Sequence, residues 1–99
     1  MEGHRLRDQY WLEGSSNYVI WKERIIFLLD EYYLKAFVDN VVAVPRDTDQ
    51  NKKYKSDMEK AKRLILNGVK DHIVSHIAGK NTAKEIWQAL SMLYKGTSE

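Results

Sequence analysis

The chain has no cysteine, a single proline and only five glycines among its 99 residues. Without cysteine it can form neither disulfides nor thiolate metal sites, and this composition accords with a reducing, cytoplasmic environment. So few helix-breaking residues favour a helical bundle. No apolar run approaches the roughly 18 residues of a membrane span, and no apolar signal segment follows Met1. We therefore predict neither membrane insertion nor secretion.

An excess of charge of one sign is also lacking, since 16 basic and 14 acidic residues leave a net charge of +2. This balance by itself indicates neither a nucleic-acid partner nor a membrane surface. The apolar share of 43% is enough for a core, and the length fits one domain over residues 1–99. We expect residues 1–9 to be flexible and residues 10–16 to form an extended segment that pins the amino end to the body.

The apolar spacing predicts an all-α fold of four to five helices. The first helix should run from about residue 17 to 33, followed by a short turn at 34–38 and a loop at 39–49. A second helix should follow the capping residues at 47–49 and end at the Asn67-Gly68 break, with a third at 69–77. Thr82-x-x-Glu85 is a capping box that opens the last helix. The predicted core face of the first helix comprises Tyr18, Trp21, Ile25, Leu28 and Tyr32.

The first helix also carries apolar residues on the face opposite its core stripe. Ile20, Phe27 and Leu34 repeat at intervals of seven residues, which places them on one line along a helix. A helix that is apolar all round is either buried centrally or covered by a partner. Two interpretations follow: the 39–48 loop wraps this stripe, or the stripe docks another chain and the protein self-associates.

Catalytic or metal-binding chemistry is not predicted. His72 and His76 stand four residues apart, but zinc needs three or four protein ligands and the only other histidine is His4. Asp30 and Glu31 are adjacent and point about 100° apart on a helix, so they do not form a carboxylate pair. We expect a non-enzymatic protein without metal or cofactor.

The second helix has a basic character that suggests weak contact with RNA. A helix can bring four of its basic side chains onto neighbouring surface, and these are Lys52, Lys55, Lys62 and Arg63. Acidic residues interrupt the run, as on an ordinary solvated face. We predict weak, sequence-independent RNA binding at most.

Two distant segments share the spacing of one family. Residues 12–21 read Leu-x-Gly-x-x-Asn-Tyr-x-x-Trp, and residues 82–94 read Thr-Ala-Lys-Glu-Ile-Trp-x-x-Leu-x-x-Leu-Tyr. Together with Ala61, Leu64 and Ile65 in the middle, this pattern resembles the Gag polyprotein of copia-type LTR retrotransposons. The resemblance covers about residues 10–95.

The resemblance implies the first lobe of a retroviral capsid-like fold, which builds a lattice by contacts between subunits. The second lobe and the Cys/His zinc knuckle of the family have no counterpart up to Glu99, so we expect an excised, truncated or domesticated Gag lobe. Domesticated lobes of this kind bind peptides. The alternative to self-association is therefore capture of an extended partner peptide in a groove beside Tyr10, Trp11 and Leu12, with Tyr33 on the adjoining helix.

Overall fold

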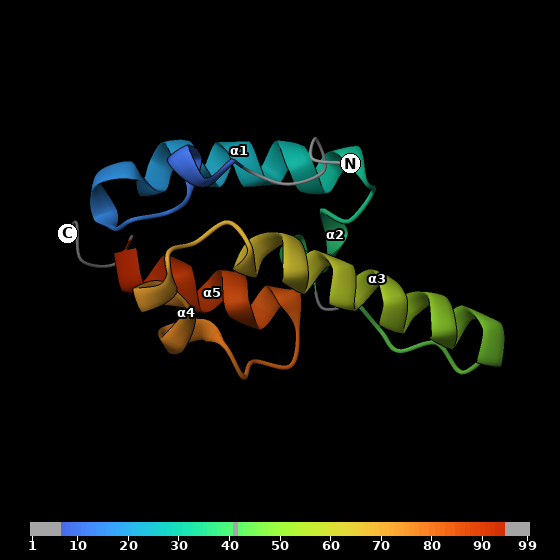
Figure 1. Cartoon of the computed structure of the whole chain (residues 1–99). Coiled ribbons are helices and arrows are strands. Elements are labelled where there is room, and N and C mark those ends of the chain that lie inside the picture. The colour runs from blue at the N-terminus through green and yellow to red at the C-terminus, as the bar shows by residue number, and fades with distance from the viewer. Residues whose placement is uncertain (1–6, 41, 95–99) are drawn as a thin grey trace.

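The computed structural model describes residues 7–40 and 42–94. Within these ranges the chain forms five α-helices and two short 3-10 helices and contains no strand, which confirms the predicted all-α bundle. In chain order the elements are η2 (Asp8–Tyr10), η3 (Ser15–Asn17), α1 (Tyr18–Glu31), α2 (Ala36–Asp39), α3 (Thr48–Leu66), α4 (Asp71–Ile77) and α5 (Ala83–Tyr94). Helix α1 lies along one side of the molecule, and α4 and α5 lie on the other (Figure 1).

Helix α1 buries a stripe that differs slightly from the predicted one. Tyr18, Trp21, Ile25 and Leu29 are buried, whereas Leu28 is only partly buried against the core. The predicted stripe alternated spacings of three and four, an average of 3.5 residues per turn. A straight helix has 3.6 residues per turn, so it drifts away from such a repeat. Leu29 therefore replaces Leu28 on the inner face.

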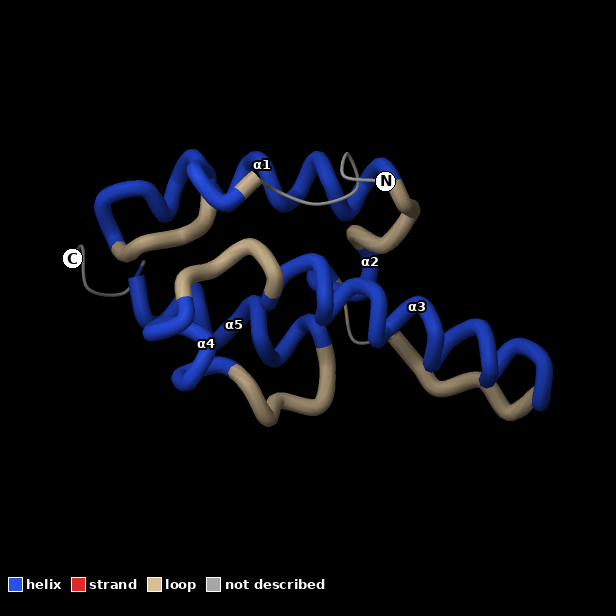
Figure 2. The backbone as a smooth tube through the Cα atoms, viewed as in Figure 1, coloured by secondary structure: helices blue, strands red, loops and turns tan. Residues whose placement is uncertain are grey.

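Helix α3 begins where the acidic residues predicted it. The Asp47 side chain caps it by accepting a hydrogen bond from the Gln50 backbone N–H at 3.0 Å. The N-terminal half of α3 projects beyond the rest of the molecule, and the preceding loop runs alongside it (Figure 2). The Asn51 side chain fastens this loop by donating to the Pro45 carbonyl at 3.0 Å. Because the loop lies along α3, it does not wrap α1, and that interpretation is wrong.

The break at Asn67-Gly68 brings the link between α3 and α4 against the amino-terminal segment. Helix α3 ends at Leu66, and the chain then runs beside Leu12 in a short parallel bridge. The Leu12 N–H donates to the Gly68 carbonyl at 2.8 Å, and the Lys70 N–H donates to the Leu12 carbonyl at 3.0 Å. The Trp21 indole Nε1 donates to the same Gly68 carbonyl at 2.7 Å. One carbonyl thus ties the amino-terminal segment, α1 and the α3–α4 link together.

The amino-terminal segment is less extended than predicted. Of residues 10–16, Leu12 forms the bridge, but Tyr10 ends one 3-10 helix and Ser15 begins another. Asn17 does not cap α1 with its side chain. Its Oδ1 accepts from the Glu13 N–H at 3.0 Å and its Nδ2 donates to the Trp11 carbonyl at 2.9 Å, so it folds the chain back before the helix. Most of the predicted flexible stretch, residues 1–6, lies outside the described residues.

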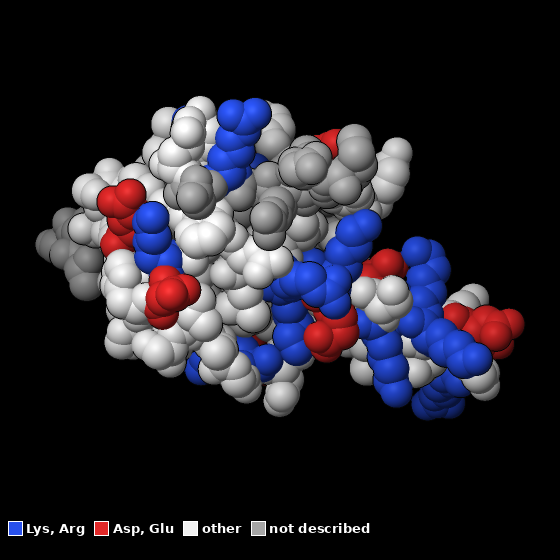
Figure 3. All heavy atoms as spheres, viewed as in Figure 1, with Lys and Arg blue, Asp and Glu red and all other residues white. Residues whose placement is uncertain are grey.

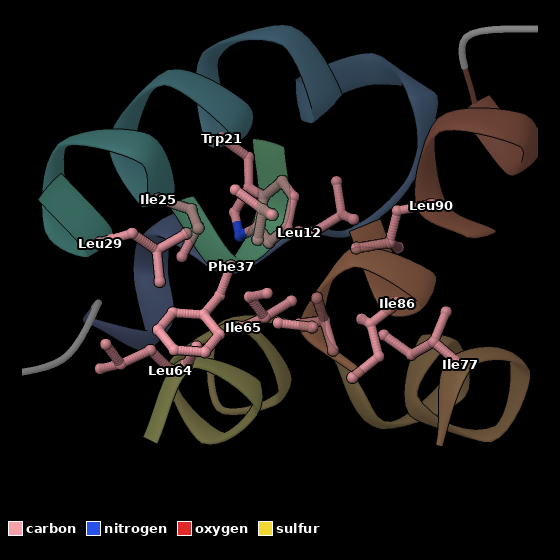
Figure 4. Close-up of a cluster of buried hydrophobic side chains, with 14 of the residues drawn as sticks. Leu12, Trp21, Ile25, Leu29, Phe37, Leu64, Ile65, Ile77, Ile86 and Leu90 are labelled. Carbon is pink, nitrogen blue, oxygen red and sulfur yellow. The ribbon is translucent and has the colours of Figure 1, made fainter. Parts of the chain in front are cut away.

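The second half of the fold follows the predicted signals closely. Gly79 ends the α4 region with a φ of +92°, a conformation that favours glycine. The Glu85 N–H donates to Thr82 Oγ1 at 3.1 Å, and the Glu85 carboxylate accepts from the Asn81 N–H at 3.0 Å, so the capping box forms one residue wider than its usual pattern. The core between α1, α3, α4 and α5 is entirely apolar among the described residues (Figure 4).

Candidate interaction site

The outer face of α1 exposes large apolar side chains to solvent. Val19, Ile20 and Phe27 are 72%, 55% and 73% exposed. Ile20 and Phe27 lie opposite the buried stripe of the same helix, and Val19 lies on the adjoining flank. Isolated exposed apolar residues are ordinary, but a group on one helix face marks a candidate contact surface. We call Val19, Ile20 and Phe27 the outer apolar face.

Leu34 does not belong to this face, and its predicted place in the exposed stripe is wrong. The Leu34 side chain is buried, because α1 ends at Glu31 and the chain reverses there. The Leu34 N–H donates to the Leu29 carbonyl at 2.8 Å and the Tyr33 N–H donates to the Asp30 carbonyl at 3.0 Å, which is a Schellman motif. No glycine marks this turn in the sequence, so the predicted helix extends past the observed end.

Tyr33 occupies the left-handed position of that turn. Its φ is +61°, a conformation that costs a non-glycine residue about 1–2 kcal/mol. Its side chain is 91% exposed, so little packing within the monomer offsets this cost. A strained, exposed aromatic residue therefore marks the carboxyl end of α1.

Acidic side chains surround the apolar centre of this face. Glu23 lies four residues before Phe27, and Asp30 and Glu31 lie three and four residues after it. These spacings place all three carboxylates beside Phe27 on the helix surface. The nearby cation, Arg24, is turned toward the amino-terminal segment, with its guanidinium 4.0 Å from the centre of the Tyr10 ring. Negatively charged side chains therefore flank Phe27.

The peptide-groove residues are not brought together as a groove. Leu12 is fully buried and both of its backbone hydrogen-bonding groups pair within the chain, so it offers a partner neither side chain nor backbone. Trp11 is half-buried, with the Lys70 ammonium 5.6 Å from its ring. Tyr10 lies against Arg24 in the middle of α1, whereas Tyr33 lies beyond the end of that helix. Hydrogen bonds from Gln9 and Arg24 lower the pKa of the Tyr10 hydroxyl.

The basic residues of α3 lie on its surface, and many lie close to acids. Lysines and arginines gather on the projecting end of α3 together with aspartates and glutamates (Figure 3). Lys62 pairs with Glu59 at 3.2 Å and Lys53 pairs with Asp57 at 3.0 Å. Lys52, Lys55 and Arg63 are exposed. The four candidates for RNA contact therefore share one helix but not one uninterrupted positive patch.

A pocket between α2, α3 and α5 was not foreseen from the sequence. It has a volume of about 230 Å³. Its apolar wall is formed by Phe37, Val42 and Met58, and its polar edge by Asn40, Thr82, Lys84, Glu85 and Gln88. These residues come from four segments that no short pattern connects, so no sequence signal could have grouped them.

His72 has a structural use. His72 Nε2 lies 3.1 Å from the Glu13 carbonyl oxygen and so holds the amino-terminal loop against α4. Across the described ranges, no group of three or more histidine, cysteine, aspartate or glutamate side chains is placed to hold a metal ion. In the same ranges, none of the helices has the length and apolar character that crossing a bilayer requires.

In the described part of the chain, five α-helices around one apolar core define a small all-α domain. A sequence model of the family described as gag-polypeptide of LTR copia-type matches residues 25–99. The chain belongs to this copia-type Gag family, as its motifs predicted. The motif at residues 12–21 precedes the matched range. Neither a search of curated proteins nor a search of solved structures found a match.

Proposed function

We propose that this Gag-type domain self-associates through the outer apolar face of α1. The observation that carries the proposal is the exposure of Ile20 and Phe27 on the helix face away from the core, together with Val19 on the adjoining flank. Fully burying one side chain of this size is worth about 1.5–3 kcal/mol. Three of them give a contact enough driving force to offset part of the entropy lost on association.

Family membership supports this function over an enzymatic one. Gag polypeptides of this type are structural rather than catalytic, and the chain belongs to that family. The lack of cysteine in the sequence is consistent with assembly in the reducing cytoplasm. Binding of an extended peptide beside residues 10–12 is less well supported, because the backbone of Leu12 already pairs with Gly68 and Lys70.

The test is the oligomeric state of the full chain across a concentration series. Light scattering coupled to size-exclusion chromatography should show a mass that rises with concentration, and Phe27→Asp should keep the protein monomeric. Because Phe27 is 73% exposed, the variant should retain the helical circular-dichroism signal. Its melting temperature should fall only slightly, through repulsion between the new carboxylate and its acidic neighbours. A wild-type protein that remains monomeric to millimolar concentration would contradict the proposal. Unfolding of Phe27→Asp would show that the residue belongs to the core.

A further inference from the structure

We infer that the partner surface for Phe27 is the α2–α3–α5 pocket of a second copy, so that the subunits join head to tail. This inference rests on the proposed self-association and adds the surface that receives α1. Phe27 is an exposed aromatic side chain, and the pocket presents buried apolar side chains from Phe37 and Met58.

The size of the pocket suits one side chain. Its volume of about 230 Å³ is below the roughly 300–1,000 Å³ of small-molecule sites. Phe37 and Met58 are buried at its wall, while Asn40 and Gln88 are exposed at its edge. An aromatic anchor in an apolar pocket with a polar rim is the usual centre of a protein interface.

The net charges of the two surfaces differ in sign. Phe27 has three carboxylates beside it, from Glu23, Asp30 and Glu31. On α3, Lys55 lies three residues before Met58 and Lys62 four residues after it, so both share the helix face of Met58.

Charged side chains of both signs lie at the pocket itself. Lys84 of α5 lines the pocket itself and adds a third cation. Glu85 also lines the pocket and keeps its negative charge while its carboxylate accepts a hydrogen bond from the Asn81 N–H at 3.0 Å. Glu59 pairs with Lys62 at 3.2 Å, so the three lysines exceed these two carboxylates by one charge. Such complementarity fixes orientation and accelerates association.

The two surfaces are separate on each subunit. The residues that line the pocket come from α2, α3, α5 and the segments adjoining them, and none comes from α1. A contact between two different patches is heterologous. It leaves a free patch at each end of a dimer and therefore continues into a ring or a filament. A contact of α1 with α1 would instead close at the dimer.

This difference gives a decisive mixing experiment. Phe27→Asp removes the side chain that inserts and leaves the pocket intact. Gln88→Trp fills the pocket from its exposed edge and leaves Phe27 intact. Each variant alone should bind itself about ten- to a hundredfold more weakly than wild type. An equimolar mixture should form one-to-one dimers that do not grow further, since only one good contact remains.

Sedimentation velocity of the full-length variants, separately and mixed, with a fluorescent label on one of them, measures this directly. Met92→Asp is the matched control: Met92 is 77% exposed on α5 outside both surfaces, so this variant should assemble like wild type. Suppose that wild type assembles and Phe27→Asp does not. If Gln88→Trp then assembles normally, or if the mixture stays monomeric, the head-to-tail contact is wrong and self-association stands. If wild type itself stays monomeric, both proposals fail. Loss of assembly in Met92→Asp also overturns the pocket assignment.

Discussion

Removal of the Trp21 indole should be the most destabilising single truncation on α1. The side chain is fully buried, its ring lies 5.8 Å from that of Trp87, and its N–H donates to the Gly68 carbonyl. Truncating a buried tryptophan to alanine costs about 3–5 kcal/mol. A domain of this size has only about 5–15 kcal/mol of stability. Since 1 kcal/mol lowers the melting temperature of such a domain by about 4–8 °C, Trp21→Ala should melt at least about 12 °C below wild type.

Two further variants separate packing from hydrogen bonding at this position. Trp21→Phe keeps most of the buried ring area but loses the indole N–H. The Gly68 carbonyl still accepts from the Leu12 N–H, so it is not left unsatisfied, and the lost bond should cost only about 1 kcal/mol. Trp11→Ala is the matched control, since Trp11 is only half-buried and should cost less. Thermal and urea melts followed by circular dichroism measure all three. A Trp21→Ala protein that melts within about 5 °C of wild type would refute the packing described here.

Three other predictions concern separate regions. Tyr33→Gly should stabilise the protein by about 1 kcal/mol because it relieves a φ of +61°, whereas Tyr33→Ala, which keeps a Cβ, should not; urea melts compare them. Burial raises the pKa of the Tyr94 hydroxyl above its ordinary value of 10.0. The unfolded chain therefore releases this proton at a lower pH than the folded chain does, so the free energy of unfolding should fall as the pH rises above about 10. Melts across an alkaline pH series should show a smaller fall for Tyr94→Phe. RNA binding should be weak and should vanish above physiological salt in fluorescence anisotropy, and a nanomolar Kd at physiological salt would contradict this.

Most helix boundaries were predictable because each depends on local chemistry. Asp47, Gly68 and the Thr82–Glu85 pair act within one turn of the helix ends that they set. The carboxyl end of α1 was not predictable in the same way. Its Schellman turn uses Tyr33 where a glycine is usual, so the sequence carried no stop signal and the burial of Leu34 was missed. The folding of residues 10–16 also escaped prediction, because it depends on Asn17 bonding backward to Glu13 and Trp11 instead of capping the helix.

The two halves of the proposed interface differ in the same respect. Ile20 and Phe27 could be found from the sequence, because a seven-residue interval on one helix defines a face without any knowledge of tertiary structure. The pocket could not, since Phe37, Val42, Met58 and Lys84 meet only after α2 and α3 pack against α5. The sequence alone therefore identifies the helix face, and only the folded chain shows a candidate surface that could receive it. Contacts within its own subunit do not explain the carboxylates beside Phe27. The proposed contact explains them, because it brings them close to the lysines beside Met58 of the next subunit.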